Sequence, residues 1–291
     1  MTLPYHSIPS YLSPSALREL EADPIAFYLA RCGPEDTRPL KPEQTINMVV
    51  GICFDSLVKV RLARVVNCPC PSLAELLSGV ENKALLEEGM KKGEELVSAY
   101  VLTGAFDLLL KDGLKEVNLV PGQQVVPGTS RLLLGRELGG VPLLGYPDAL
   151  CRKEDGTAVI LDWKCTSAGS PHPGWNMLLS MNDPMQRFKP SHDRCGELMD
   201  TLNPEWAAQL ATYSWLTRPG VGHGEGFRDV DVAIDQVIYG AACVKVARFR
   251  TKVSGQFQVE LRDRYQRAWE KLKEGTLVDT DLTPQQLRLL R

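Results

Sequence analysis

The sequence predicts a mixed α/β (α+β) fold in which a central mixed β-sheet is flanked by helices. Helical periodicity dominates roughly the first 110 residues, and strand-like runs cluster at about 130–166 and 229–254. Helical patterns follow each of the two strand clusters. Helices, then a mainly antiparallel sheet, then more helices are typical of layers packed around one core. We therefore expect residues 1–291 to form a single domain.

The N-terminal part, about residues 11–110, is expected to be helical. Ser13 followed by Pro14 is a strong helix start, because serine caps the first turn and proline suits the first helical position. That helix should end near Asp23, since the proline after it disfavours a helical residue before it. Further helices are expected around residues 27–29 and over residues 44–66 and 72–110.

Beyond a glycine-rich connector at residues 112–128, the pattern changes to runs that predict strands. A stretch rich in Pro, Gly, Ser, Asn and Asp then predicts either a long loop or a small inserted element, and such long loops are often functional. A core at about 125–255 is thus followed by C-terminal helices at about 256–291. We expect strands at 130–138, 141–152 and 157–166, the long loop at 167–204, a helix at 204–217, strands at 229–241 and 243–254, a helix at 258–274, and a short helix after Leu282.

Composition and charge exclude several classes of protein. The apolar content of 44% and charged content of 24% are ordinary for a folded domain. A net charge of −3 and a pI near 5.9 give no global basic signature, so a nucleic acid would have to be held by a local basic patch. No segment approaches the ~20 apolar residues that span a bilayer, and the N-terminus lacks signal-peptide regions. Eight scattered cysteines are typical of reduced thiols in a cytoplasmic protein.

The most informative feature joins Gly145-Tyr-Pro-Asp148 to Asp162-Trp-Lys164 across thirteen residues. The second motif closes an apolar, β-branched run, which predicts a buried strand. Residues i and i+2 of a strand face the same side, so Asp162 and Lys164 should point together, away from Trp163. Two carboxylates and a lysine can build a metal site for phosphodiester cleavage. The alternative is a surface hairpin with unrelated aspartates and a solvated lysine.

The turn before this strand, Glu154-Asp155-Gly156, decides how the two aspartates face each other. A two-residue turn would leave Asp148 and Asp162 on opposite faces, whereas a three-residue loop with Gly156 in the left-handed conformation places them opposite each other. Like charges across a ladder are unfavourable, so that register makes most sense with a cation between them. We choose the three-residue loop because it explains the charges.

Two predicted helices carry polar residues at suitable spacings. Gly51 lies one turn before Asp55, where glycine costs about 1 kcal/mol relative to alanine, and close approach of another element would explain it. Asp55 follows an apolar run and is either a buried carboxylate or a solvated i,i+4 partner of Lys59. Gln209 and Tyr213 share one helical face, which either touches a phosphate or a metal ligand or is an ordinary half-buried face.

Together these motifs resemble the RecB-like branch of the PD-(D/E)XK nucleases, a branch that includes phage-encoded exonucleases. The resemblance covers about residues 11–216, and the order of the motifs is more specific than any one of them. Many members have histidine at the position of Asp55, although an aspartate can still bind a hard cation. The motifs are Ser13-Pro14-Ser15-Ala16-Leu17, Gly51-x-x-x-Asp55, Gly145-x-Pro147-Asp148, Asp162-x-Lys164 and Gln209-x-x-x-Tyr213.

The resemblance implies a metal-dependent DNA nuclease with a restriction-endonuclease-like catalytic core at about 125–255. It implies an exonuclease of phage or mobile-element recombination and repair, acting in the host cytoplasm. Asp148, Asp162 and the backbone carbonyl of Trp163 would bind Mg²⁺ or Mn²⁺. Asp55 would contact the same ion, or a second one about 3.5–4 Å away.

The other motif residues would act on the water and the phosphate. Lys164 would orient or help deprotonate the attacking water and offset charge on phosphorus. Gln209 and Tyr213 would position the phosphate or the metal ligands. Some members of the branch carry an iron–sulfur cluster with three closely spaced cysteines near the C-terminus. No such triplet follows Cys243, so we expect no cluster, although Cys32 lies about where a first ligand would be.

DNA is the expected partner and a membrane is not, while a recombination partner protein and an oligomer are left open. Two rival functions remain: a catalytically weak nuclease fold that binds DNA or protein, and a metal-dependent hydrolase of smaller phosphoesters. Each candidate DNA contact is alternatively a plain surface residue. The candidates are Arg187, Lys189 and Arg194 in the long loop, Lys245, Arg248, Arg250 and Lys252 on the later strands, and Trp175 and Phe188 for base stacking.

Overall fold

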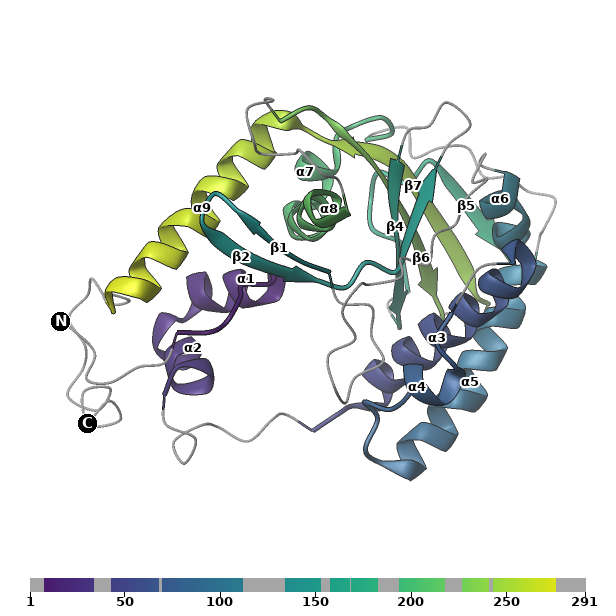
Figure 1. The fold of residues 1–291 in the computed structure, drawn as a ribbon. Helices are drawn as coiled ribbons and strands as arrows, with labels where there is room; N and C mark the ends of the chain where they lie inside the picture. The colour runs from purple at the N-terminus through teal and green to yellow at the C-terminus, as the bar shows by residue number, and fades with distance from the viewer. Residues whose placement is uncertain are drawn as a thin grey trace.

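The structure is a computed structural model that describes residues 8–33, 43–67, 70–111, 134–152, 158–167, 169–182, 194–217, 227–240 and 243–275. Within these ranges the fold is mixed α/β, as predicted (Figure 1). The helices are α1 (Pro14–Ala22), α2 (Pro24–Arg31), α3 (Ile46–Val66), α4 (Leu73–Leu76), α5 (Lys83–Leu102), α6 (Ala105–Lys111), α7 (Met199–Leu202), α8 (Pro204–Thr217) and α9 (Gly255–Glu274). The strands are β1 (Leu134–Leu138), β2 (Val141–Gly145), β3 (Ala149–Arg152), β4 (Ala158–Thr166), β5 (Met177–Ser180), β6 (Val230–Ile238) and β7 (Lys245–Val253).

The described strands form a five-stranded sheet in the order β3-β4-β6-β7-β5 and a separate β1–β2 hairpin. Strand β4 runs parallel to β6, and the other neighbouring pairs of the large sheet are antiparallel. The predicted central mixed sheet is therefore confirmed. Its parallel pair needs a crossover connection, which contains α8.

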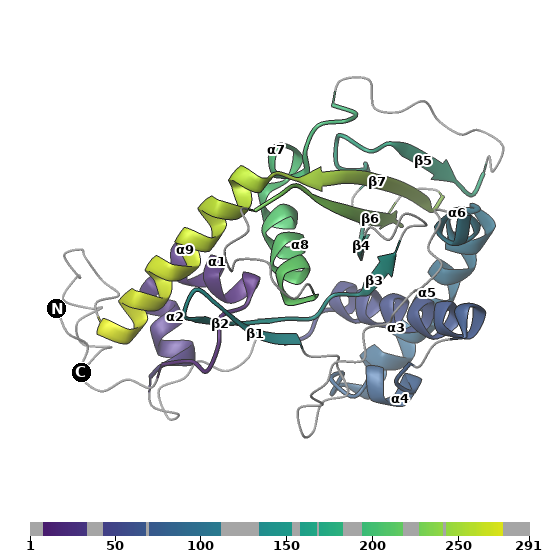
Figure 2. The ribbon, with the colours of Figure 1, turned by 45° about the horizontal axis from the view of Figure 1, so that its top comes forward.

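Helices cover both faces of this sheet, as Figure 2 shows from a second direction. On one face, α3, α5 and α6 pack against Leu161 and Trp163 of β4. On the other face, α8 packs with α1 and α9 in a core that includes Ile160 of β4. Because successive residues of a strand point to opposite faces, Asp162 lies on the α8 side. The alternation along β4 thus places two charged residues, Asp162 and Lys164, on the side of α8.

Local capping explains where the predicted helices begin and end. The Ser13 hydroxyl accepts a hydrogen bond from the Ala16 amide at 3.1 Å, and α1 ends at Ala22, just before Asp23. Asp23 then caps α2 through its carboxylate. Ser254 caps α9, which begins three residues before the expected position. These boundaries come from short polar side chains that satisfy the free amides of the first turn.

Two predicted elements are corrected by the structure, and a third is specified. The single helix expected over 72–110 is divided into α4, α5 and α6, because Asn82 caps a new helix and Gly104 adopts a φ of +78° after α5. The strand expected over 141–152 is divided into β2 and β3 at Tyr146-Pro147-Asp148, where proline has no amide for a ladder. The described part of 167–204, expected as a long loop or a small inserted element, contains β5 and α7, which agrees with the second alternative. The connector at 112–128 and the helix after Leu282 lie outside the described residues.

The close approach of another element that was expected at Gly51 of α3 occurs at a glycine of α5 instead. A Cβ at Gly51 would lie 3.8 Å from Cys165, which is ordinary van der Waals contact. A Cβ at Gly93 of α5 would lie only 2.9 Å from the Cβ of Cys53 in α3. Glycine on α5 therefore lets the two long helices pack closely. No helix in the described ranges is long and apolar enough to cross a membrane.

Candidate active site

The register of β3 and β4 brings the two motif aspartates face to face. Ala149 pairs with Leu161 in this antiparallel ladder, so one further step places Asp148 opposite Asp162. The strands therefore have the register that the three-residue turn predicts, and residues 153–157, which contain the turn, lie outside the described residues. The charge argument from the sequence identified the correct pairing.

Asp162 and Lys164 lie together on one side of β4, as their spacing predicts. The Lys164 ammonium is 2.6 Å from Asp162 Oδ2 and donates to Gln209 Oε1 at 2.8 Å. Burial alone would lower the pKa of Lys164, but attraction to Asp162 and to the other aspartates outweighs burial and raises it. Lys164 is thus an ammonium group held between Asp162 and Gln209.

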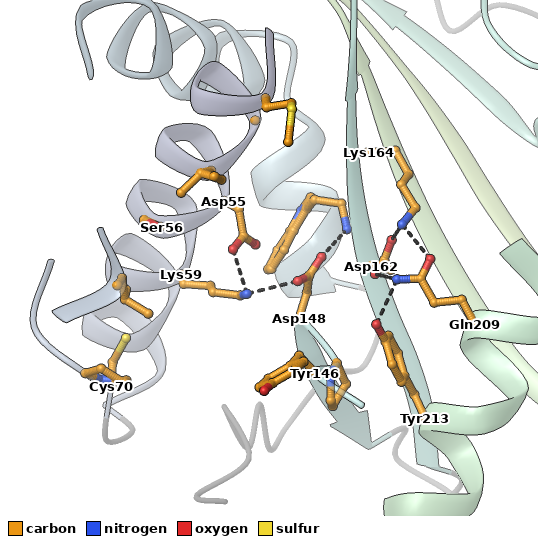
Figure 3. Close-up of a pocket in the computed structure, with 17 residues that line it drawn as sticks. Asp55, Ser56, Lys59, Cys70, Tyr146, Asp148, Asp162, Lys164, Gln209 and Tyr213 are labelled. Atoms are coloured by element: carbon orange, nitrogen blue, oxygen red, sulfur yellow. Dashed lines mark hydrogen bonds and ion pairs between the residues drawn. The ribbon is translucent and has the colours of Figure 1, made fainter. Parts of the chain in front are cut away.

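A second lysine, Lys59 of α3, belongs to the same cluster. Its ammonium donates to Asp55 Oδ2 at 2.7 Å and to Asp148 Oδ1 at 2.9 Å, so it lies between the two carboxylates (Figure 3). The other oxygen of Asp148 accepts from the Trp163 amide at 2.8 Å. The sequence interpretation considered Lys59 only as a solvated partner of Asp55. Its i,i+4 spacing was the available signal, but contact with Asp148 depends on how α3 packs against the sheet.

Gln209 and Tyr213 meet the cluster from α8. The Gln209 amide donates to Tyr213 Oη at 2.8 Å and reaches Asp162 Oδ1 at 3.4 Å. The two side chains share a helical face, as their spacing predicts, and the structure points that face at Asp162 of β4. Gly145 makes room for this contact, since a Cβ there would lie 2.7 Å from the Tyr213 ring. Gly145 thus has a packing role that the motif Gly145-x-Pro147-Asp148 alone does not reveal.

These polar groups line one side of a cavity of about 510 Å³, which lies between α3 and α8 (Figure 3). The cavity is open to solvent, and Tyr146 at its edge is 36% exposed. The remaining lining is mostly apolar and comes from α3, from α4 and from the segment between these two helices. These lining residues are Met48, Ile52, Cys70, Pro71 and Leu76.

The cluster contains more negative than positive charge. Three carboxylates (Asp55, Asp148, Asp162) and two ammonium groups (Lys59, Lys164) leave a formal charge of −1. Burial and repulsion from Asp148 raise the pKa of Asp55 to about 7. Burial, with repulsion from Asp148 and against the attraction of Lys164, raises the pKa of Asp162 to about 6. Asp148 differs, because Lys59 and Lys164 outweigh burial and hold its pKa below the ordinary value.

The donor set fits a hard divalent cation. Magnesium prefers oxygen ligands and needs few carboxylates, since waters and substrate phosphate complete its shell. Asp55 Oδ1 is a buried acceptor with no hydrogen-bond partner among the described residues. The described side chains form no group of three Asp, Glu, His or Cys that could hold a metal ion. Lysines contact each of the three carboxylates instead.

The predicted DNA contacts are less well supported by the structure. Arg248 is wrong as a DNA contact: its side chain is buried and pairs with Asp235 at 3.3 Å. Arg194 pairs with Glu197 at 3.0 Å and also donates to a backbone carbonyl of α7. Among the other candidates, Arg250 pairs with Asp235, Trp175 packs against the core, Lys252 is exposed, Lys245 is half-buried, and Arg187, Phe188 and Lys189 lie outside the described residues.

Comparisons with known proteins leave the family of this chain open. No family model matches the sequence, and no curated protein matches it. Among solved structures, the crystal structure of SSO0001 is similar with 12% sequence identity, over 87% of this chain and 84% of that one. The TM-score of that match is 0.28, so the likeness carries no argument about fold family or function.

Proposed function

We propose that this protein is a metal-dependent DNA nuclease of the RecB-like type with a restriction-endonuclease-like core. The observation that carries the proposal is the β3–β4 register, which sets Asp148 opposite Asp162 with Lys164 on the same face. Two buried carboxylates opposite each other are costly unless a cation is to be held between them. A mixed sheet with helices on both faces supports the core.

Asp148 and Asp162 are the residues that would hold Mg²⁺ or Mn²⁺. The backbone carbonyl of Trp163 is the further protein ligand that we propose. Such an ion, when bound, supplies Lewis-acid polarisation of a phosphate oxygen and lowers the pKa of a water molecule. The Trp163 amide keeps Asp148 oriented toward the ion by its 2.8 Å hydrogen bond.

The remaining side chains of the site serve the phosphate and the attacking water. Lys164, held by Asp162 and Gln209, presents a fixed positive charge where negative charge grows on phosphorus. Gln209 and Tyr213 orient Asp162 and Lys164 from α8. Hydrolysis adds water across one P–O bond and leaves a phosphate end and a hydroxyl end. The open cavity beside these groups is the proposed place for the DNA strand.

Within this function we propose an exonuclease of phage or mobile-element DNA recombination and repair. The test is degradation of linear double-stranded, linear single-stranded and closed circular DNA with Mg²⁺, with Mn²⁺ and with EDTA. The proposal expects metal-dependent loss of linear DNA and survival of the closed circle. Cutting of the circle would replace exonuclease by endonuclease action. Hydrolysis of nitrophenyl phosphates without any DNA cutting would favour a hydrolase of small phosphoesters.

One observation favours a second function, a catalytically weak nuclease fold that binds DNA or protein. Lys59 places an ammonium between Asp55 and Asp148, where an acidic site could otherwise hold a metal ion. If that ammonium prevented metal binding altogether, the fold would retain a DNA cleft without chemistry. DNA retarded on a gel but left uncut with either metal would support this second function over the first.

A further inference from the structure

Lys59 differs from the other charged residues of the site because it is bound on both sides by carboxylates. Its side chain is only 16% exposed, and its ammonium is within hydrogen-bonding distance of Asp55 and Asp148 at once. The ammonium therefore has the position of a bridging cation.

We propose that Lys59 is the built-in cation of the Asp55–Asp148 half of the site, so that the site binds one divalent ion, on Asp148 and Asp162. The inference rests on the proposed function and specifies its metal requirement. It assigns Asp55 to the anchoring of Lys59 instead of to a second metal ion.

Geometry is the first argument against a second ion. A magnesium ion shared by Asp55 and Asp148 would need their oxygens at about 2.1 Å. The Lys59 nitrogen already lies 2.7 and 2.9 Å from one oxygen of each carboxylate, so an ion and the ammonium would compete for the same space. Their positive charges would also repel each other strongly in this half-buried place.

Charge balance is the second argument. The three carboxylates and two lysines carry a formal charge of −1, so one divalent ion brings the cluster to +1. That value matches the single negative charge of the phosphodiester to be bound. Two divalent ions would bring the cluster to +3, an excess that no further carboxylate offsets among the described residues of the cavity lining. One ion together with Lys59 therefore neutralises the site more closely than two ions do.

The third argument is that Lys59 stands on a firmly packed helix. Its neighbour Val58 is fully buried, as is Phe54 one turn earlier, both in the core against β4 and α5. The close α3–α5 packing at Gly93 leaves little space for α3 to shift. Moving the ammonium away would leave Asp55 and Asp148 without their shared partner, which is costly for buried carboxylates. The packing of α3 therefore holds the Lys59 ammonium in a constant position beside Asp55 and Asp148.

The test counts bound Mn²⁺ ions by electron paramagnetic resonance, which reports free Mn²⁺ whether or not DNA is cut. An Asp148→Ala variant gives the background of adventitious ions, because both halves of the site share Asp148. We expect one ion per chain above this background for the wild type and two for Lys59→Met. A double variant with Lys59→Met and Asp55→Asn should return to one ion. Lys92→Met removes an exposed lysine with a helical ion pair and should leave the count at one.

Two ions on the wild type would overturn the inference, and so would one ion on Lys59→Met or two on the double variant. If Lys59→Met does not fold by circular dichroism, Lys59→Gln replaces it, and the wild-type count alone still tests the proposal. DNA cleavage is measured on the same samples. A wild type that binds one ion and cuts nothing refutes the proposed nuclease but not the single-ion site. Two bound ions together with active cutting refute the single-ion site but not the proposed nuclease. If no ion binds, the single-ion site is refuted too.

Discussion

Two clusters of buried carboxylates and cations lie on neighbouring strands of the sheet. In the ladder of β4 and β6, Trp163 pairs with Asp235, one residue along from Asp162. Asp235 therefore points to the α5 side of the sheet, whereas Asp162 points to the α8 side. Asp235 is fully buried and contacts Arg250 at 2.8 Å and Arg248 at 3.3 Å.

The two clusters differ in how completely their charge is offset. Burial alone would raise the pKa of Asp235, but Arg250, Arg248 and a hydrogen bond from the Tyr100 hydroxyl hold it below its ordinary value. At the site, burial raises the pKa of Asp162 to about 6 despite Lys164. The comparison teaches that burial and ion pairing alone do not mark a functional carboxylate. What distinguishes the site is its shortage of positive charge beside an open cavity.

The largest expected effect is on cleavage. Asp162→Ala removes a proposed metal ligand and should lower the rate of DNA cutting by ~10³-fold or more. Gel assays with Mg²⁺ measure this, with Asp107→Ala as a control because Asp107 is an exposed carboxylate on α6. If Asp162→Ala cut DNA at the wild-type rate, the distinction between a functional cluster at Asp162 and a structural one at Asp235 would be wrong.

Asp235→Ala should act on stability. It leaves Arg248 and Arg250 without their buried carboxylate, so the free energy of unfolding should fall by about 3–5 kcal/mol. Urea unfolding followed by circular dichroism measures the change. If the free energy of unfolding fell by less than about 1 kcal/mol, the cluster around Asp235 on β6 (the β6 cluster) would not be the structural one.

Asp162→Asn should instead raise the stability of the protein when EDTA removes metal ions. The substitution removes one negative charge from a site with three carboxylates and two ammonium groups, and the gain in the free energy of unfolding should be on the order of 1–3 kcal/mol. Thermal unfolding would then shift upward by a few degrees, at ~2 °C per kcal/mol. Added Mg²⁺ should stabilise the wild type and cancel the difference. A fall in stability in EDTA would contradict the proposed shortage of positive charge.

The smallest effect is a pH dependence of the β6 cluster. The pKa of Asp235 is lowered in the folded state, so its ionised form stabilises the fold above the ordinary value of 3.8, and this stabilisation is lost as pH falls below it. The stability difference between wild type and Asp235→Asn should therefore narrow as pH is lowered through that range. A difference that does not change between pH 6 and 3 would rule out the assigned shift.

Much of the fold could be predicted because the decisive signals are local. Ser13 and Asp23 cap helices through neighbours three residues away or closer, and the alternation around Asp162 fixes which side of β4 it faces. The β3–β4 register followed from a short turn and a charge argument.

The features that escaped prediction depend on contacts between distant segments. Lys59 meets Asp148 across 89 residues, and only the packing of α3 against the sheet brings them together. Arg248 looks like a surface cation in the sequence, yet its strand turns it inward onto Asp235. Strand β5 was missed inside the expected loop because it is four residues long and gains its ladder from β7.

The most direct test of the proposed chemistry compares two lysine variants on linear DNA. Lys164→Met removes the ammonium that contacts Asp162, while Lys92→Met removes an exposed lysine on α5. Initial cleavage rates are measured with Mg²⁺ and with EDTA. We predict that wild type and Lys92→Met cut at the same rate with Mg²⁺, that neither cuts with EDTA, and that Lys164→Met does not cut. Cutting by Lys164→Met at the wild-type rate would contradict the proposed site.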